Sequence, residues 1–365
     1  MPTVTINAEG VVFYYEDSGP LAGSSNYVTL VVIHGFIFHG ASYNLRLLAV
    51  NLRDYPGSTP YSPSELAFLC SEHVADQAAA VRSQGREIAE FLRCIIETEH
   101  LPPVGDRAGK KTGGIAVMSW SMGNVWATSL FGNTSSLDEA TKKILSTALH
   151  TWILYDPPHY PAGIPLPEEI YYPNRDENIP LDKRAAVFSR WVSGFYTPLV
   201  EVTDDAQVLG GRQNVYDVTG EEAYRPTTDV LTTEELESIT TPGVLLRSGQ
   251  VIFTTKDKVW WDNAESALCD IDPAFSHVKA LLIWCNMAPG PSPVGVKNIM
   301  DRVRGAAALG KLAREVKLLT IDRANHFVGT FLFLSSVYTE VIARFIGMSR
   351  TGFYGPLQPT SKDSL

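Results

Sequence analysis

The sequence predicts an α/β fold: a doubly wound, mostly parallel sheet with an inserted, mainly helical cap. Apolar β-branched runs alternate with helical segments, and the stretch at residues 113–124, GGIAVMSWSMGN, has the pattern of a buried strand that turns sharply into a helix. The alternation stops between residues 157 and 275. With 365 residues to bury a full core, we predict a discontinuous core at 1–156 and 276–365, with the cap at 157–275.

The strands of the predicted sheet are short apolar runs. An opening antiparallel strand is expected at Val11 to Tyr15, and the run YVTLVVI at residues 27–33 is typical of a strand covered on both faces. The helix expected at Val74 to Glu97 has apolar residues at spacings of three and four, so one of its faces should pack against the sheet. The remaining strands are expected at Leu45 to Leu52, Ile115 to Met118, Trp152 to Tyr155, His277 to Cys285 and Val316 to Ile321.

The inserted segment differs from the rest of the chain in composition. Prolines crowd residues 157–180, and Thr232 with Glu235 matches the capping box of a helix. A helix from Leu181 to Tyr196 would carry four apolar side chains on one face, namely Phe188, Trp191, Val192 and Phe195. We expect a helical lid in which Trp191 and Tyr196 contact substrate.

Composition argues against several classes of protein. The 30 basic and 40 acidic residues give a net charge of -10 with no Lys/Arg block, so nucleic acid is not an expected partner. No apolar run of about eighteen residues and no leader pattern occur, which favours a cytoplasmic protein without a membrane span. The four cysteines form no CxxC pair and there is no HExxH motif, so no metal or other cofactor is expected. The expected partner is a small-molecule substrate, and oligomeric state does not follow from the sequence.

The turn at Ser121 is predicted to be a nucleophile elbow. Ser119 and Gly123 lie two positions either side of it and are small, as a strained turn between closely approaching backbones requires. The flanking segment Val125 to Phe131 suits a buried helix that ends at Gly132. A serine hydroxyl is a weak nucleophile at neutral pH, so the chain must also supply a histidine base and a carboxylate that orients it.

Two histidines and two aspartates are candidates for these roles. His326 is the favoured base because it follows the last predicted strand and precedes an apolar helix, whereas His159 is the competitor in the loop DPPHY. Asp156 is the favoured acid because it ends a strand directly before two prolines. Asp322 is the alternative acid, but it lies four residues before His326, where its side chain can cap that turn instead. Along the chain, Ser121 comes first, then Asp156 and then His326. This matches a known catalytic arrangement in which Ser is followed by Asp or Glu and then by His.

The predicted oxyanion site uses two backbone amides. Met122 starts the helix after the serine, where the helix dipole is positive, and Phe36 lies in the loop HGFIFHG after the second strand. Gly35 in the same loop allows close approach to substrate. Trp120 adjoins the nucleophile, which favours a pocket for an apolar or aromatic acyl compound.

The elbow, the HGF loop and the DRANHF loop together resemble the α/β-hydrolase superfamily, over residues 11–156 and 277–347. The resemblance implies a cap domain at the insertion. Many members place the acid after the penultimate strand, but here LLIWCNMAPG has no carboxylate. Some haloalkane dehalogenases and a zearalenone lactonase carry it after the preceding strand, in a place similar to that of Asp156. A serine at position 121 excludes dehalogenase and epoxide hydrolase chemistry, whose nucleophile is Asp.

The expected function is a cofactor-independent serine hydrolase. It would cleave an ester or lactone of a small, largely apolar substrate through an acyl-enzyme intermediate. Three alternatives remain open from the sequence: an acyltransferase with the same triad, a carbon–carbon hydrolase or lyase, and a ligand receptor on the same fold.

Overall fold

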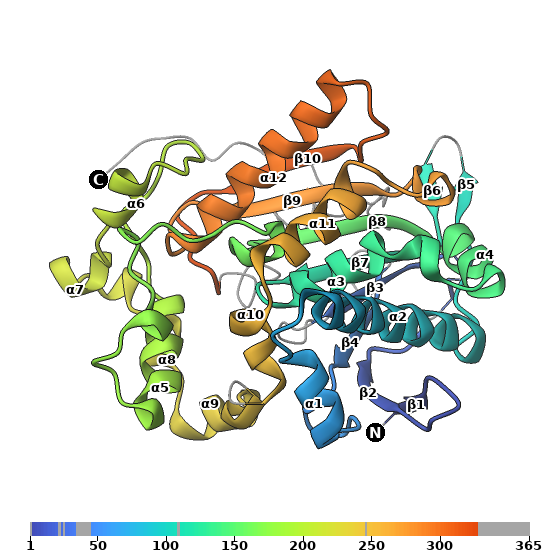
Figure 1. Cartoon of the computed structure of the whole chain (residues 1–365), viewed down its shortest axis with the longest axis horizontal. Coiled ribbons are helices and arrows are strands. Elements are labelled where there is room, and N and C mark those ends of the chain that lie inside the picture. Colours follow the sequence, from blue (N-terminus) through green and yellow to red (C-terminus); the bar gives the residue numbers. More distant parts are fainter. Residues whose placement is uncertain are drawn as a thin grey trace.

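In the described part of the chain, the main sheet has eight strands in the order β1-β2-β4-β3-β7-β8-β9-β10 (Figure 1). The computed structural model describes residues 2–20, 23–24, 26–33, 45–107, 110–244 and 247–327. The strands of the sheet are β1 (Thr3–Thr5), β2 (Val12–Asp17), β3 (Val28–Ile33), β4 (Leu45–Asn51), β7 (Ile115–Trp120), β8 (Leu149–Tyr155), β9 (Lys279–Cys285) and β10 (Val316–Ile321). A separate ribbon pairs β5 (Gly105–Arg107) with β6 (Lys110–Thr112).

Strand direction and register bring several strand ends to one edge of the sheet. Neighbouring strands from β4 to β10 run parallel, whereas β2 pairs antiparallel with β1 and β4. Tyr155 at the end of β8 is in register with Trp120 at the end of β7 and with Ile283 of β9. The predicted mostly parallel sheet with an antiparallel opening strand is confirmed, and the residues that follow β7, β8 and β10 lie along one edge.

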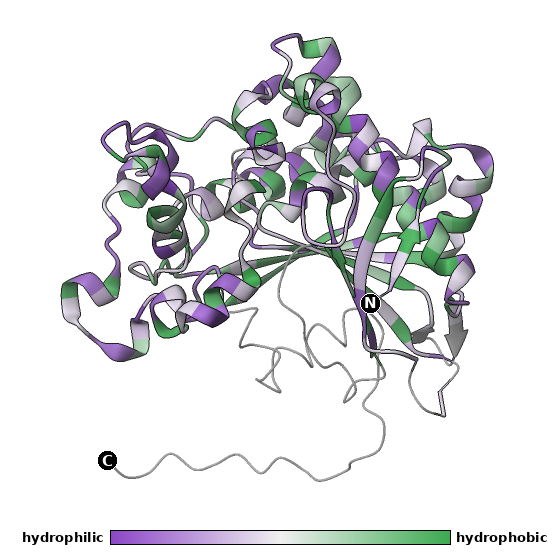
Figure 2. Ribbon diagram, turned by 90° about the horizontal axis from the view of Figure 1, so that it is seen from below, coloured by the Kyte–Doolittle hydropathy of each residue, from purple (hydrophilic) through white to green (hydrophobic). Residues whose placement is uncertain are grey.

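Most of the described helices lie on one face of the sheet, and some lie beside it (Figure 2). They are α1 (Pro63–Leu69), α2 (Val74–Thr98), α3 (Gly123–Gly132), α4 (Glu139–Ala148), α5 (Leu181–Val192), α6 (Ala206–Gly210), α7 (Val215–Thr219), α8 (Thr227–Val230), α9 (Thr233–Ile239), α10 (Val251–Thr254), α11 (Asp257–Leu268) and α12 (Pro291–Ala308). The predicted long helix is α2, which packs against α3 through a face that buries Ile88, Leu92 and Ile95. None of the described helices is long and apolar enough to cross a membrane.

The central strands β3, β7, β8 and β9 are buried on both faces, as a parallel sheet requires, whereas β1 and β10 are partly exposed. Val117 and Leu154 belong to the core that also contains the buried side chains of α2 and α3. Met118 and Ile153, one position along each strand, belong to a second core on the opposite face.

Residues 157–275, which we call the β8–β9 connection, contain only helices and turns in their described part, apart from a single bridge between Tyr196 and Asn214. The capping box at Thr232 is confirmed at the start of α9. The helix predicted from Leu181 to Tyr196 ends at Val192 instead. Beyond this end, Phe195 O accepts a hydrogen bond from Val215 N at 2.7 Å and Tyr196 forms the bridge with Asn214, so Phe195 does not extend the apolar face.

The connection divides into two parts in space. Helices α5 to α9 lie to one side of the sheet in Figure 1, whereas α11 packs against α3 and α2 of the sheet's helical layer. The division of the chain into core and cap stays a prediction.

Candidate active site

Ser121 sits on a sharp turn between β7 and α3. Its φ is +52°, a left-handed conformation that is uncommon for a residue with a side chain, and its N–H donates to Tyr155 O at 3.1 Å. A Cβ atom at Gly123 would lie 2.4 Å from Ile33 O, so only glycine fits where α3 begins against β3. The turn therefore has the tight geometry that the sequence predicted for an elbow.

Asn124 braces this turn from within and was not singled out by sequence reasoning. Its side chain is fully buried. Its Oδ1 lies 2.8 Å from the hydroxyl of Ser119, and its Nδ2 donates to Ser121 O at 2.9 Å and to Tyr155 O at 3.3 Å. The available signal was an amide side chain in the first turn of an otherwise apolar helix.

Asp156 follows β8 and is fully buried, again with a positive φ of +44°. Its Oδ1 accepts from Cys285 N at 3.2 Å, and its Oδ2 accepts from Ser292 Oγ at 3.1 Å and faces His326 Nδ1 at 2.5 Å. Ser292 lies in the first turn of α12, whose dipole favours a negative charge there. This carboxylate is therefore held in one orientation by three donors. Ser292 carried no sequence signal, because its role depends on a contact with a strand far away in the chain.

His326 lies in the loop after β10 and is 3% exposed. The carboxylate of Asp156 accepts the Nδ1 proton, which assigns the tautomer with a free lone pair on Nε2. Trp120 Nε1 donates to His326 O at 3.0 Å, and the Trp120 and His326 rings lie 5.5 Å apart. The base loop is thus attached to the residue that precedes Ser121.

The predicted catalytic residues are not all joined by hydrogen bonds. His326 Nε2 is buried and has no hydrogen-bond partner among the described residues, and so none with Ser121. Met122 precedes α3, and within the described ranges its N–H has no acceptor, as an oxyanion donor requires. Phe36 and Gly35 lie outside the described residues.

The other titratable groups near this corner are placed differently. Asp322 is exposed and accepts from Asn286 Nδ2 at 2.7 Å. His159 lies against Tyr160 and Tyr172, where burial, with Arg175 nearby, lowers its pKa to about 3 and keeps it neutral. Within the described part of the chain, no group of three or more His, Cys, Asp or Glu side chains is placed to hold a metal ion.

Trp191 and Tyr196 line a cavity of about 460 Å³ in the β8–β9 connection. The other described lining residues are Tyr171, Ala186, Val187, Arg190, Asn214 and Asp217. Ser121 and Trp120 are not among them. The structure therefore separates the predicted substrate contacts, with Trp120 beside His326 and the other two aromatic side chains in this cavity.

The comparison with known proteins rests on structure alone. No protein-family model matches the sequence, and no curated protein matches it significantly. The solved structure of Rv0554 from Mycobacterium tuberculosis is 13% identical, with a TM-score of 0.51 over 95% of this chain and 98% of that one. A thermophilic esterase, 13% identical, has a TM-score of 0.45 over 95% and 99%. MGS-M2, an α/β hydrolase enzyme from a Medee basin deep-sea metagenome library, is 13% identical with a TM-score of 0.40 over 94% and 97%.

The chain has the α/β-hydrolase fold. Strand order, the parallel sheet and the strand–serine–helix turn at Ser121 agree with the structural likeness, which at 13% identity concerns the fold only. In this example of the α/β-hydrolase fold, Asn286 follows β9 and joins two loops. Its Nδ2 donates to Leu199 O at 3.2 Å, and its Oδ1 accepts from Arg323 N at 2.9 Å. The carboxylate paired with His326 follows β8.

Proposed function

We propose that the protein is a serine hydrolase that cleaves an ester or lactone of a small, largely apolar substrate. One observation carries the proposal: His326 Nδ1 lies 2.5 Å from Asp156 Oδ2, and the buried Nε2 has no partner among the described residues, in a loop hydrogen-bonded to Trp120, the residue before Ser121. A buried polar atom without a partner costs stability, so such an atom calls for a functional explanation.

In the proposed reaction, the Ser121 hydroxyl attacks the acyl carbon while His326 Nε2 takes its proton. The negative charge on the former carbonyl oxygen is stabilised by the amides of Met122 and Phe36. His326 then protonates the departing alcohol, and a water molecule repeats the sequence to release the acid. Support for the oxyanion role comes from the N–H of Met122, which has no acceptor in the described part of the chain and lies at the positive end of α3. One such donor is typically worth about 2.7–4 kcal/mol in the transition state.

The proposed preference for apolar substrates rests on aromatic side chains. Trp120, which precedes Ser121, packs against His326, and Phe327 packs edge-on against Trp120 with ring centroids 5.0 Å apart. Aromatic surface of this kind suits an apolar acyl or alcohol group.

A fluorophosphonate probe tests the nucleophile. We expect one adduct per chain on a peptide that contains Ser121, and none in Ser121→Ala. Absence of labelling in the folded protein, while a known serine hydrolase is labelled under the same conditions, would contradict the proposal.

Product analysis tests the reaction class. With a panel of aryl and alkyl esters, free acid should be the product even when an alcohol or amine is added. Acylated acceptor as the main product in water would establish an acyltransferase instead. Thermal stabilisation by a ligand that remains chemically unchanged would favour a receptor.

A further inference from the structure

Asn325 directly precedes His326 and is fully buried. Both protons of its amide have partners in the β8–β9 connection: Nδ2 lies 2.6 Å from Ser193 O and 2.9 Å from Thr227 Oγ1. The loop after β10, which carries His326, is therefore hydrogen-bonded through the Asn325 side chain to two residues of the connection.

Those two points are also bonded to each other. Ser193 is the C-cap of α5, and its carbonyl accepts from the N–H of Thr227, the first residue of α8, at 3.1 Å. The hydroxyl of Ser193 lies 2.9 Å from that of Thr228. The end of α5 and the start of α8 form one unit, which Figure 1 shows on the same side of the sheet.

The same amide also fixes the backbone around the imidazole. Asn325 Oδ1 accepts from Phe327 N at 3.0 Å, which closes a turn across His326. On the other side of this turn, Trp120 Nε1 holds His326 O. If α5 and α8 move away from the base loop, the two hydrogen bonds of Asn325 Nδ2 must break. The Oδ1 of the same side chain shapes the turn at His326.

We propose that Asn325 is a positioning residue that couples the β8–β9 connection to His326, so that the imidazole is held for catalysis only when the ends of α5 and α8 are docked. This inference rests on the proposed function, because it assigns a regulation to the same site. It predicts that a change at Thr227, which is bonded to Asn325 and not to His326, alters the reactivity of Ser121.

Three substitutions separate coupling from local support. Thr227→Val removes the hydroxyl acceptor at similar volume, and Thr227→Ser retains it. Asn325→Asp keeps an oxygen for Phe327 N and removes the donor to Ser193 O. The matched control is Asn263→Ala, which removes a buried amide that bonds Asn133 and Ser129 between α11 and α3, away from the base loop.

The first readout is the saturation kinetics of fluorophosphonate labelling. We expect Thr227→Val to lower the maximal labelling rate about three- to tenfold, the size expected for one hydrogen bond, with half-saturation changed less than about twofold. Asn325→Asp should lower it further, Thr227→Ser should restore it, and Asn263→Ala should leave it unchanged in the folded fraction. Wild-type rates in Thr227→Val and Asn325→Asp would overturn the coupling.

The second readout does not need a reactive serine. Hydrogen exchange of the peptide at residues 322–327 should be faster in Thr227→Val than in wild type, together with exchange at residues 190–196. In Asn263→Ala it should change only around α3 and α11. Unchanged exchange at 322–327 in Thr227→Val overturns the inference, whereas a wild-type protein that resists labelling contradicts only the proposed function.

Discussion

Two buried polar regions differ in how far their hydrogen-bonding groups are paired. One is the corner that contains Ser121, Asp156 and His326, and the other is the cluster around Arg53. In the corner, His326 Nε2 has no partner in the described part of the chain, and neither has the N–H of Met122. Ser121 and Asp156 also have positive φ angles. The unpaired atoms distinguish this corner, since a positive φ also occurs at Asp54, next to Arg53.

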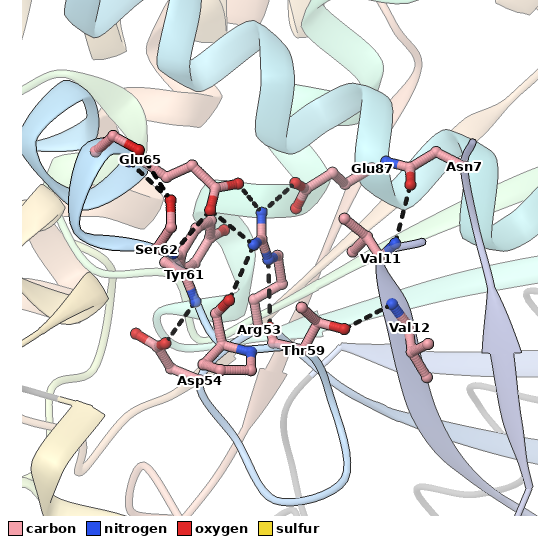
Figure 3. Close-up of polar contacts among 12 residues, drawn as sticks. Asn7, Val11, Val12, Arg53, Asp54, Thr59, Tyr61, Ser62, Glu65 and Glu87 are labelled. Carbon is pink, nitrogen blue, oxygen red and sulfur yellow. Dashed lines mark hydrogen bonds and ion pairs between the residues drawn. The ribbon is translucent and has the colours of Figure 1, made fainter. Parts of the chain in front are cut away.

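In the second region every donor of Arg53 is used (Figure 3). Nη1 lies 2.5 Å from Glu65 and 3.0 Å from Glu87, Nη2 lies 3.0 Å from both Glu65 and Pro60 O, and Nε lies 3.3 Å from Thr59 O. A guanidinium has five N–H donors, and all five are satisfied here. Glu65 also caps α1, so the cluster ties this helix to the loop after β4.

The difference indicates which buried polar groups serve stability and which serve chemistry. A buried network in which every charge and donor is paired makes the folded state more stable than the same network with one partner removed. A strained or unpaired group, in contrast, persists only where the surrounding structure enforces it. On this basis, substitutions in the corner should change reactivity more than stability, and substitutions around Arg53 should do the reverse.

The largest effect is expected for Asp156→Asn. With the amide oxygen accepting from Cys285 N, the amide NH2 faces His326 Nδ1 and donates to it, so the imidazole loses the tautomer with a free Nε2. We expect kcat/KM with an activated ester to fall by about 10⁴. The matched control Asp322→Asn, which keeps an oxygen for Asn286 Nδ2 and loses only the charge, should cost less than about tenfold. The opposite ranking would assign the acid to Asp322.

Arg53→Met should produce the largest change in stability. It leaves Glu65 and the largely buried Glu87 without their cation, which typically costs about 3–5 kcal/mol in the free energy of unfolding. Arg93→Met, which removes half-buried pairs on the surface of α2, should cost at most about 1 kcal/mol. Urea unfolding measures both. A tenfold loss of labelling in folded Arg53→Met would break the separation between the two regions.

Gly123→Ala tests how far the turn at Ser121 can shift before the reactivity of the serine falls. Because the added methyl would meet Ile33 O at 2.4 Å, the turn at Ser121 must shift, and we expect labelling to slow about a hundredfold. The control is Gly305→Ala in α12, where nothing lies within 4 Å and a stabilisation of roughly 0.5–1 kcal/mol is expected. Equal labelling rates in the two variants would show that the turn is not constrained by β3.

Most of the fold could be predicted because its signals are local. Each predicted strand is present, with ends displaced by three residues or fewer, since apolar β-branched runs and the small residues around Ser121 require no knowledge of partners. The helix at Leu181 was predicted too long because Phe195 and Tyr196 pair instead with Val215 and Asn214, distant residues that a local pattern does not reveal. The catalytic roles of Ser121, Asp156 and His326 stay predictions.

The groups that support the candidate site could not be predicted in this way. Ser292 meets Asp156 from 136 residues away, and Asn325 meets Ser193 from 132 residues away. Neither residue stands out by type or spacing in the sequence. Hydrogen bonds between distant segments depend on the packed tertiary structure, so they become visible only when the strands and helices are in place.

Glu87→Gln is expected to have the smallest effect and sharpens the comparison within the Arg53 cluster itself. Burial raises the pKa of Glu87 from 4.5 to about 7, and the nearby Arg53 opposes this shift without cancelling it. The folded state therefore binds this proton more tightly than the unfolded state does, so stability falls as pH rises from about 4.5 to about 7. Gln cannot ionise, so the variant does not lose this stability.

Between pH 5 and pH 8, the unfolding free energy of Glu87→Gln should gain roughly 1–3 kcal/mol relative to wild type in urea titrations. Glu97→Gln, at a half-exposed position on the same helix, should follow wild type. If the unfolding free energy of Glu87→Gln instead runs parallel to that of wild type across this pH range, Glu87 ionises in the folded protein without cost. The charge of Glu87 is then fully compensated, as the N–H donors of Arg53 are.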